Sequence, residues 1–86
     1  MARYKIEISR TAEKQLKKLP QLEQKRVAKV ILELADDPFP KGSRKLAGYE
    51  EVLRIRVGRY RILYSVSGKT LVIIVLKIGH RKDVYR

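Results

Sequence analysis

The chain has 86 residues, among them 21 Lys and Arg, 9 Asp and Glu, one His and no Cys, which gives a formal net charge of +12. A chain of this length buries roughly 60 to 65% of its unfolded surface, which excludes two domains and a large enclosed pocket. The absence of cysteine excludes disulfides and thiolate metal sites, and one histidine cannot form a histidine-rich site. We therefore expect a single domain over residues 1–86 with no metal and no cofactor.

The charge and the hydropathy of the chain also bear on its location and its partner. The first residues lack the apolar run of a signal peptide, and the longest apolar stretch, Leu71 to Leu76, is too short to cross a bilayer. We expect a cytoplasmic protein. The excess of positive charge predicts an acidic partner, which on charge alone is nucleic acid, an anionic membrane or an acidic protein segment.

The N-terminal part of the sequence indicates one strand followed by two helices. Residues 3–8 alternate apolar and charged side chains, which predicts a half-buried strand. Ser9 suits the N-cap of a first helix, in which apolar residues recur every three or four positions. Pro20 is acceptable in the first turn of a second helix, which has an apolar stripe and should end near Ala35.

The rest of the sequence indicates a long loop and three strands. Residues 36–49 combine several Pro, Gly and Ser residues and predict the longest connection. Three strand-like runs follow, at about 51–57, 59–67 and 70–78. Because the turns between them are short, we expect the three runs to form an antiparallel meander.

This order of elements predicts an α+β fold, in which two N-terminal helices pack on one face of a small, mainly antiparallel four-stranded sheet. The third run is apolar on both sides, as expected of a central strand. We expect the first strand to pair beside it, so that Ile6 and Ile8 are buried together with Ile73 and Val75. The opposite face of the sheet then remains open.

Positive charge is concentrated in the second half of the chain. Residues 1–41 hold 10 basic and 6 acidic residues, whereas residues 42–86 hold 11 basic and 3 acidic residues. Four arginines fall on two strands joined by a tight turn, and we expect them to project from one face: Arg54, Arg56, Arg59 and Arg61. Like charges this close repel one another, which favours a phosphate-bearing ligand over a merely solvated basic face.

The C-terminal sequence adds four polar residues directly after the third run: His80, Arg81, Lys82 and Tyr85. Together they could supply a proton-transfer group, a phosphate clamp and a stacking ring. Taken singly, each is also explained as a polar strand end, a solvated tail or an aromatic cover of the core.

A metal-independent cleavage of RNA is the chemistry that these residue types allow. It requires removal of the 2′-hydroxyl proton, neutralisation of a pentacoordinate phosphate, and protonation of the leaving 5′-oxygen. Arginine suits the second task but stays protonated, which leaves His80, Tyr85 or Lys82 for proton transfer. Glu50 and Glu51 would point to opposite faces of a strand, so the chain shows no paired-carboxylate signature for magnesium.

Several segments resemble a known family. They are Tyr4-Lys5-Ile6 with the helix after it, Lys45-Leu46-Ala47-Gly48, the run from Leu53 to Tyr64 that contains Gly-Arg-Tyr-Arg-Ile-Leu-Tyr, and Ile78-Gly79-His80-Arg81-Lys82-Asp83-Val84-Tyr85. The sequence thereby resembles the RelE/ParE superfamily of bacterial and archaeal toxins over nearly its whole length. The C-terminal segment is more typical of the RelE branch.

The resemblance implies a toxin of a type II toxin-antitoxin system. It implies an endoribonuclease, or mRNA interferase, that cleaves mRNA in the ribosomal A site by metal-independent attack of the 2′-hydroxyl. It further implies a cognate, acidic, RelB-like antitoxin that holds the toxin inactive in a hetero-oligomer, and no membrane partner. Arg61 and Arg81 match phosphate-contacting arginines of the family, and Tyr85 matches a tyrosine that stacks on the base or shares in proton transfer.

The sequence also departs from the best-known branch of that family. Arg54 and Arg56 stand where that branch has two lysines, which preserves phosphate binding but weakens the case for a lysine base. His80 could take that role, and we expect Arg59 and Lys82 to bind phosphate as well. An exposed Leu63 on the open face, together with the arginines, should attract an acidic amphipathic segment of the antitoxin.

Two other functions remain open at this point. ParE-like members of the superfamily share the fold but inhibit DNA gyrase, and the joint presence of Arg61, Arg81 and Tyr85 argues against that branch. From a different class, the chain could be a non-catalytic RNA-binding module whose basic face only holds phosphates.

Overall fold

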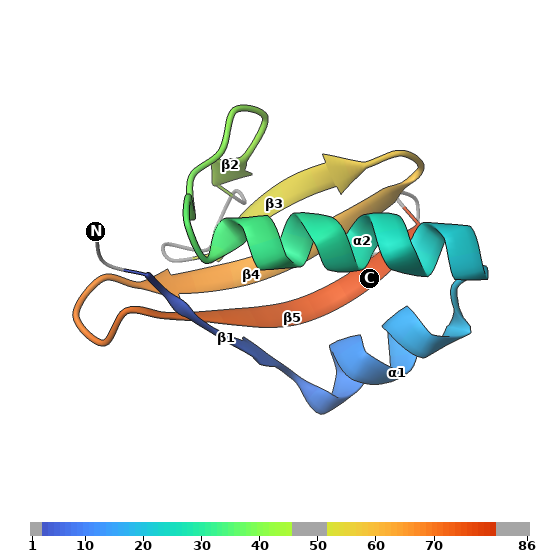
Figure 1. Cartoon of the computed structure of the whole chain (residues 1–86), viewed down its shortest axis with the longest axis horizontal. Helices are drawn as coiled ribbons and strands as arrows, with labels where there is room; N and C mark the ends of the chain where they lie inside the picture. Colours follow the sequence, from blue (N-terminus) through green and yellow to red (C-terminus); the bar gives the residue numbers. More distant parts are fainter. Residues whose placement is uncertain (1–2, 46–51, 81–86) are drawn as a thin grey trace.

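The computed structural model describes residues 3–45 and 52–80. In this part of the chain, two helices lie on one face of a five-stranded sheet (Figure 1). The elements follow in the order β1 (Lys5–Ile8), α1 (Arg10–Lys18), α2 (Gln21–Leu34), β2 (Arg44–Lys45), β3 (Val52–Val57), β4 (Tyr60–Ser67) and β5 (Val72–His80). The predicted α+β fold is therefore confirmed, with β2 as an additional strand.

Both helices begin and end close to the predicted positions. The Ser9 hydroxyl accepts a hydrogen bond from the Ala12 N–H at 3.0 Å, so Ser9 caps α1 as expected. Pro20 is the N-cap of α2, and Ala35 is its C-cap. Between the helices, the Gln24 side-chain amide donates to the carbonyl of Lys17 at 2.9 Å and thereby fixes the junction.

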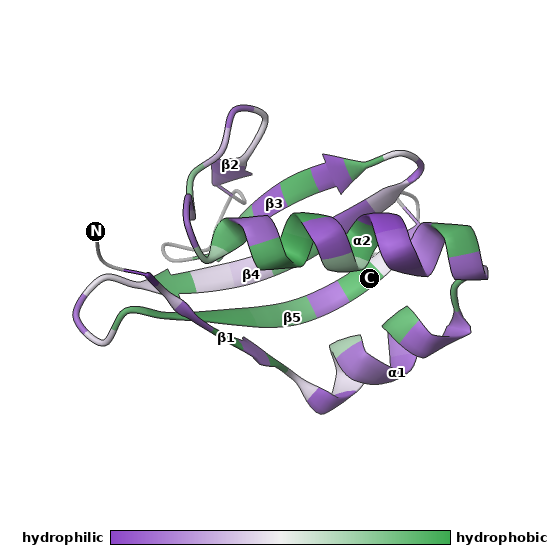
Figure 2. Cartoon of the chain, viewed as in Figure 1, coloured by the Kyte–Doolittle hydropathy of each residue, from purple (hydrophilic) through white to green (hydrophobic). Residues whose placement is uncertain are grey.

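The sheet has the strand order β1-β5-β4-β3-β2, in which β5 is an interior strand between β1 and β4 and the middle strand is β4. Figure 2 shows that most of β5 is apolar, whereas α2 alternates apolar and polar residues as a helix with one buried side does. The first strand pairs in parallel with β5, and its register sets Ile6 opposite Ile73 and Ile8 opposite Val75, as predicted. Ile8 nevertheless remains 38% exposed, because β1 lies at the edge of the sheet.

The core fills the space between the two helices and the inner face of the sheet. It consists of apolar side chains from both layers together with one tyrosine: Ala12, Val27, Ile31, Leu34, Leu53, Ile55, Val57, Ile62, Tyr64, Ile73, Val75 and Ile78. The phenol of Tyr64 is fully buried and donates a hydrogen bond to the Pro38 carbonyl at 2.9 Å. This bond fixes the loop after α2 against the core.

The prediction of four strands was wrong by one short strand. Residues 44–45 belong to the predicted loop, yet Arg44 pairs with Arg54 and Lys45 pairs with Leu53. A turn in which the Ser43 N–H donates to the Pro40 carbonyl, with Gly42 at φ 101°, leads the chain into this pairing. Two consecutive basic residues are too few to show the alternation that predicts a strand, so their own sequence carried no strand signal.

The last strand begins two residues later than predicted. The Ser67 hydroxyl accepts hydrogen bonds from the Thr70 N–H and hydroxyl, and Leu71 adopts a left-handed conformation with φ 56°. These features extend the turn to Leu71, and β5 begins at Val72. In the described ranges, neither helix is long and apolar enough to pass through a membrane.

Candidate nucleic-acid interface

Four arginines lie on the face of the sheet that the helices leave uncovered. Residues paired across a sheet project from the same face, and residues two apart on a strand do so as well. Arg54 and Arg56 alternate with the buried Leu53, Ile55 and Val57, so they point away from the helices. Their partners are Arg44 opposite Arg54 and Arg61 opposite Arg56. We call this set, Arg44, Arg54, Arg56 and Arg61, the arginine face.

The arginine face encloses a hollow of about 350 Å³. Among the described residues, its lining consists of Gly42 and the four arginines and includes no carboxylate. Ion pairs elsewhere in the described ranges join Arg3 to Asp36, Lys17 to Glu13 and Arg26 to Glu23. None of those pairs involves Arg44, Arg54 or Arg56, so their positive charge faces the hollow without a compensating carboxylate from the described residues.

This arrangement suits a phosphate group. Guanidinium groups carry five N–H donors in a planar fork that matches two phosphate oxygens, and they keep their charge at any physiological pH. Like charges placed directly opposite each other on a sheet destabilise it, and a bound anion removes that cost. A backbone with repeated phosphates would occupy several of the arginines at once.

The structure adds two basic residues that the sequence analysis did not place on this face. Arg44 lies in the predicted loop and joins the hollow only because β2 pairs with β3. Lys77 lies opposite Leu63, which itself lies opposite Arg54, so Lys77 shares the face of the arginines. No local sequence signal indicates either placement, because both depend on the register of neighbouring strands.

Two predicted site residues lie elsewhere. Arg59 is in the two-residue turn between β3 and β4 and lines a separate hollow with Pro20, Leu22, Glu23, Arg26, Gly58 and Tyr60. The expectation that it shares the face of the other arginines was therefore wrong, since a turn residue does not follow the alternation of the strands.

His80 is also on the helix-covered side of the sheet. It pairs with Tyr60, two residues from the buried Ile62, and the two rings meet edge to face with centroids 6.1 Å apart. The sheet thus separates this imidazole from the arginine face, beside which the sequence analysis had expected it.

Leu63 corrects a further expectation. It lies on the arginine face as predicted, but it is only 6% exposed. Its neighbours across the sheet are Arg54 and Lys77, whose long aliphatic stems suit the cover of an apolar side chain. Leu63 is therefore not an exposed apolar contact for a partner.

The remaining predicted residues, Arg81, Lys82 and Tyr85, lie outside the described residues. Their expected roles stay predictions. Among the residues that are described, no group of three or more His, Asp and Glu side chains is arranged to hold a metal ion.

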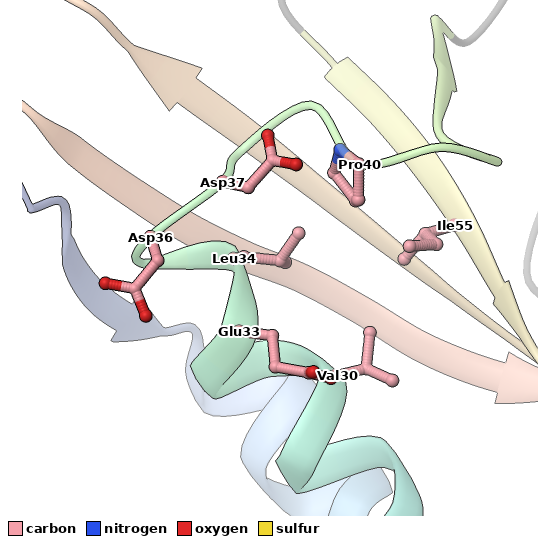
Figure 3. Close-up of a pocket in the computed structure, with 7 residues that line it drawn as sticks. All are labelled: Val30, Glu33, Leu34, Asp36, Asp37, Pro40 and Ile55. Carbon is pink, nitrogen blue, oxygen red and sulfur yellow. The ribbon is translucent and has the colours of Figure 1, made fainter.

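A second hollow, of about 380 Å³, has the opposite charge. It lies between the C-terminal end of α2, the following loop and β3, and Figure 3 shows three carboxylates around an apolar floor. The carboxylates are those of Glu33, Asp36 and Asp37, and the floor includes Leu34 and Ile55. These carboxylates disfavour an anionic ligand here, in contrast to the positive charge of the arginine hollow.

Comparison with known proteins agrees with this arrangement of elements. Residues 6–85 match the family model of the ParE toxin of type II toxin-antitoxin systems. Because the match spans most of the sequence, the fold is that of a type II toxin family. The chain belongs to the RelE/ParE superfamily.

Individual relatives carry RelE-type names. The chain is 33% identical to RelE1 of Methanocaldococcus jannaschii over 98% of its own length and 97% of the relative. It is 35% identical to the toxin RelE3 of the same organism over 94% of each chain. The toxin RelG of Mycobacterium tuberculosis is 31% identical over 96% of this chain and 97% of that one.

Solved structures show the same fold. The archaeal RelE–RelB complex of Pyrococcus horikoshii aligns with a TM-score of 0.83 at 31% identity, over 98% of this chain and 100% of that one. The RelB–RelE complex of Methanocaldococcus jannaschii gives 0.74 at 34% identity, over 92% and 94%. The isolated RelE toxin of Escherichia coli gives 0.79 at 26% identity, over 95% and 90%.

Proposed function

We propose that this protein inhibits translation in the cytoplasm as an endoribonuclease that cleaves mRNA in the ribosomal A site. The observation that carries the proposal is the arginine hollow, where Arg56 and Arg61 are paired across the sheet and the described part of the lining holds no carboxylate. Such a surface binds a phosphodiester backbone. The RelE-type names of the relatives favour the RelE branch, for which the family resemblance implies an mRNA substrate.

The proposed reaction needs neither a metal ion nor a cofactor. The 2′-oxygen attacks the adjacent phosphorus, and Arg61 and Arg81 neutralise the charge that develops on the phosphoryl oxygens. Arg54, Arg56 and Lys82 hold neighbouring phosphates and keep the strand in register. Because His80 lies across the sheet from the arginine face, Tyr85 and Lys82 are the preferred groups for removing the 2′-hydroxyl proton.

The proposed reaction uses the ribosome to orient the mRNA. The described lining of the arginine hollow consists of four arginines and one glycine, so it offers phosphate contacts but no aromatic or amide side chain that would orient a nucleotide base. Decoding holds the mRNA in a fixed conformation in the A site. We propose that the ribosome thereby supplies the orientation of substrate that the toxin itself lacks.

Cleavage mapping on ribosomes that carry a defined mRNA tests this function. The wild type should cut within the A-site codon in the presence of a chelator, whereas Arg61→Ala and Tyr85→Phe should lose cleavage by about 10²-fold or more. Arg10→Ala removes the same charge from an exposed position on α1 and should cut normally. Ribosome binding of each variant separates lost chemistry from lost affinity.

Two findings would replace the proposal, one from a DNA gyrase assay run beside that experiment and one from the experiment itself. Inhibition of DNA gyrase without cleavage on ribosomes would identify a ParE-like gyrase inhibitor, the activity class of other members of the superfamily. Binding to ribosomes without cleavage of any mRNA would identify a non-catalytic RNA-binding module.

We also propose that an acidic, RelB-like antitoxin holds the toxin inactive. The relatives from Pyrococcus horikoshii and Methanocaldococcus jannaschii were solved as complexes with RelB. In this chain, acidic residues of the antitoxin would occupy the arginine hollow. Since Leu63 is buried, apolar contacts would come from exposed side chains elsewhere: Ile8, Leu22, Leu32 and Phe39.

Competition between the antitoxin and RNA tests this second part. If the antitoxin occupies the arginine hollow, then the complex should neither bind nor cleave mRNA, and Arg54→Ala should weaken antitoxin and RNA binding together. Simultaneous binding of RNA and antitoxin would show that inhibition acts at another surface.

A further inference from the structure

A β-bulge in β5 directs Lys77 toward the arginine face. Val75 lies opposite Tyr64 and Lys77 lies opposite Leu63, so Leu76 is an extra residue in β5 at this point. Val75 faces the helices, and strict alternation would turn Lys77 to the same side. The bulge reverses this, so that Lys77 faces outward while Ile78 returns to the core with 0% exposure.

The bulge is held by the N-terminal part of α1. The Ser9 N–H donates to the Val75 carbonyl at 2.9 Å, and the Ser9 hydroxyl donates to the Leu76 carbonyl at 2.9 Å. On the other side of Lys77, the Ile78 N–H donates to the Gln15 side-chain oxygen at 2.7 Å. The backbone before and after Lys77 is thus fixed by three hydrogen bonds, and the direction of its side chain follows.

The position of Lys77 brings it beside the paired arginines. Gly79, two residues further along β5, lies directly opposite Arg61. Because glycine has no side chain, no side chain of β5 lies directly opposite Arg61 on this face. Within β5, Lys77 is the outward-facing side chain nearest to Arg61. A lysine at a diagonal position of a sheet lies within reach of a group bound by its neighbour.

Lys77 differs chemically from the rest of this surface. It is the one lysine in β3, β4 and β5. The other positively charged side chains of these strands on this face are arginines. A guanidinium binds phosphate but does not release its proton, whereas a lysine ammonium can release one. The face therefore combines four arginines for phosphate binding with one lysine as a potential proton donor.

We propose that Lys77 is the general acid of the cleavage reaction. This assignment rests on the proposed ribonuclease function. The bond from the 2′-oxygen to phosphorus forms as the bond from phosphorus to the 5′-oxygen breaks, and the electron pair of the broken bond remains on the 5′-oxygen. The Lys77 ammonium transfers one proton to that oxygen, becomes a neutral amine, and is protonated again from water. The 2′-hydroxyl proton leaves separately to Tyr85 or Lys82.

Lys77→Arg is the variant that separates proton transfer from charge. It keeps the positive charge and the phosphate contact, but it removes a donor that can release its proton. We expect single-turnover cleavage on ribosomes to fall by about 10² to 10⁴-fold while ribosome binding stays within a few-fold of the wild type. Lys69→Arg makes the same change in an exposed turn and should cleave at the wild-type rate.

A substrate with sulfur in place of the bridging 5′-oxygen gives the decisive measurement. A thiolate leaves without protonation, so Lys77→Arg should cleave this substrate at close to the wild-type rate. The ratio of the rates on the two substrates does not depend on how much of the variant is folded. It therefore remains informative if the substitution reduces stability, and Lys77→Gln should show the same change in the ratio.

Three outcomes would overturn the assignment. Normal cleavage of the oxygen substrate by Lys77→Arg would mean that Lys77 contributes only charge. An equal loss on both substrates would mean that it acts elsewhere than at the leaving oxygen. In both of these cases, cleavage by the wild type would still support the proposed function. The third outcome is a wild type that cleaves neither substrate, which would contradict both the proposed function and the assignment of Lys77.

Discussion

Arg56 and Arg61 are paired directly across β3 and β4, so two guanidinium groups leave the same face of the sheet from adjacent backbone positions. Opposite charges stabilise such a pair and like charges destabilise it. The pair recurs one step along the sheet, where Arg44 lies opposite Arg54. Two neighbouring pairs of opposed arginines should therefore lower the stability of the free protein, and a bound anion should reduce this repulsion. We thus expect anion binding to raise the stability measurably.

The first prediction concerns that link. In low salt, Arg56→Gln should be as stable as the wild type or more stable by a few tenths of a kcal/mol, because one repulsive partner is removed. Inorganic phosphate should raise the thermal midpoint of the wild type more than that of Arg56→Gln, since it binds the folded arginine face. Thermal unfolding over a series of phosphate concentrations measures both effects.

Arg10→Gln is the matched control for this first prediction. It removes one positive charge from an exposed position on α1, away from the arginine face. Its response to phosphate should equal that of the wild type. If Arg10→Gln and Arg56→Gln respond alike, then the effect reflects net charge and the hollow has no special affinity for anions.

The second prediction concerns the buried phenol of Tyr64. Tyr64→Phe removes the donor of the hydrogen bond to the Pro38 carbonyl and leaves that carbonyl without this partner. We expect the free energy of unfolding to fall by about 1–3 kcal/mol, measured by chemical denaturation at neutral pH. Tyr60→Phe is a suitable comparison on the same strand, because Tyr60 is only partly buried. A fully stable Tyr64→Phe would show that the hydroxyl contributes nothing to fixing the loop.

The same side chain leads to the third prediction, on pH. Burial raises the pKa of Tyr64 above its ordinary value of 10.0, the Asp37 carboxylate raises it further, and a hydrogen bond with Ser43 opposes them. A raised folded-state pKa contributes stability that is present in full below pH 10 and is lost as the pH rises through the folded value. The stability advantage of the wild type over Tyr64→Phe should therefore shrink above pH 10. An advantage that grows with pH in this range would contradict the sign of the shift.

The fourth prediction compares two neighbours on α2. Ile31 is 2% exposed and belongs to the core, whereas Leu32 is 62% exposed. Ile31→Ala should lower the free energy of unfolding by about 2–5 kcal/mol, because it leaves a cavity in packed surroundings. Leu32→Ala should change it by less than about 0.5 kcal/mol. Similar losses at both positions would mean that the outer side of α2 is covered in solution, for instance by a second molecule.

Much of the fold could be predicted because its signals are local. The cap at Ser9, the break at Pro20 and the period of α2 each depend on a few adjacent residues, and all three agree with the structure. The pairing of β1 beside β5 is a long-range feature that was also predicted correctly. Its basis was the apolar character of both sides of the third run, which identified β5 as an interior strand with a neighbour on each side.

The features that were missed depend on register, which no short segment of the sequence specifies. The pairing of Arg44 arises because Tyr64 and Gly42 fix the course of a loop that contains no strand signal of its own. The outward direction of Lys77 requires one extra residue in β5. His80 also follows the bulge, and it lies beside Tyr60. Because the bulge interrupts the alternation of side chains along β5, alternation alone could not predict the face on which His80 lies.

The candidate site was therefore only partly predictable. Arg54, Arg56 and Arg61 follow the simple alternation of two regular strands, and the structure brings them together around one hollow. Arg59 occupies a turn, where alternation does not apply, and lies elsewhere. Residues that meet through regular pairing were found from the sequence, and those that depend on turns or bulges were not.

The last prediction tests the connection between α1 and the bulge. Ser9→Ala removes one hydroxyl that accepts from the Ala12 N–H and donates to the Leu76 carbonyl. Loss of the cap and of the bond to the bulge should lower the free energy of unfolding by about 1–3 kcal/mol, measured by chemical denaturation. Ser9→Thr keeps the hydroxyl and should recover most of that loss.

The same variants should also affect catalysis if the bulge directs Lys77 toward the substrate. At a temperature where Ser9→Ala remains folded, its cleavage of the normal mRNA should be reduced several-fold, and the reduction should be smaller on the 5′-thio substrate, which does not require the proton. Ser9→Thr should behave as the wild type on both substrates. Equal rates for Ser9→Ala and the wild type on the normal mRNA would show that the bulge keeps its shape without the hydroxyl, because the bonds from the Ser9 N–H to Val75 and from the Ile78 N–H to Gln15 are then sufficient to hold it.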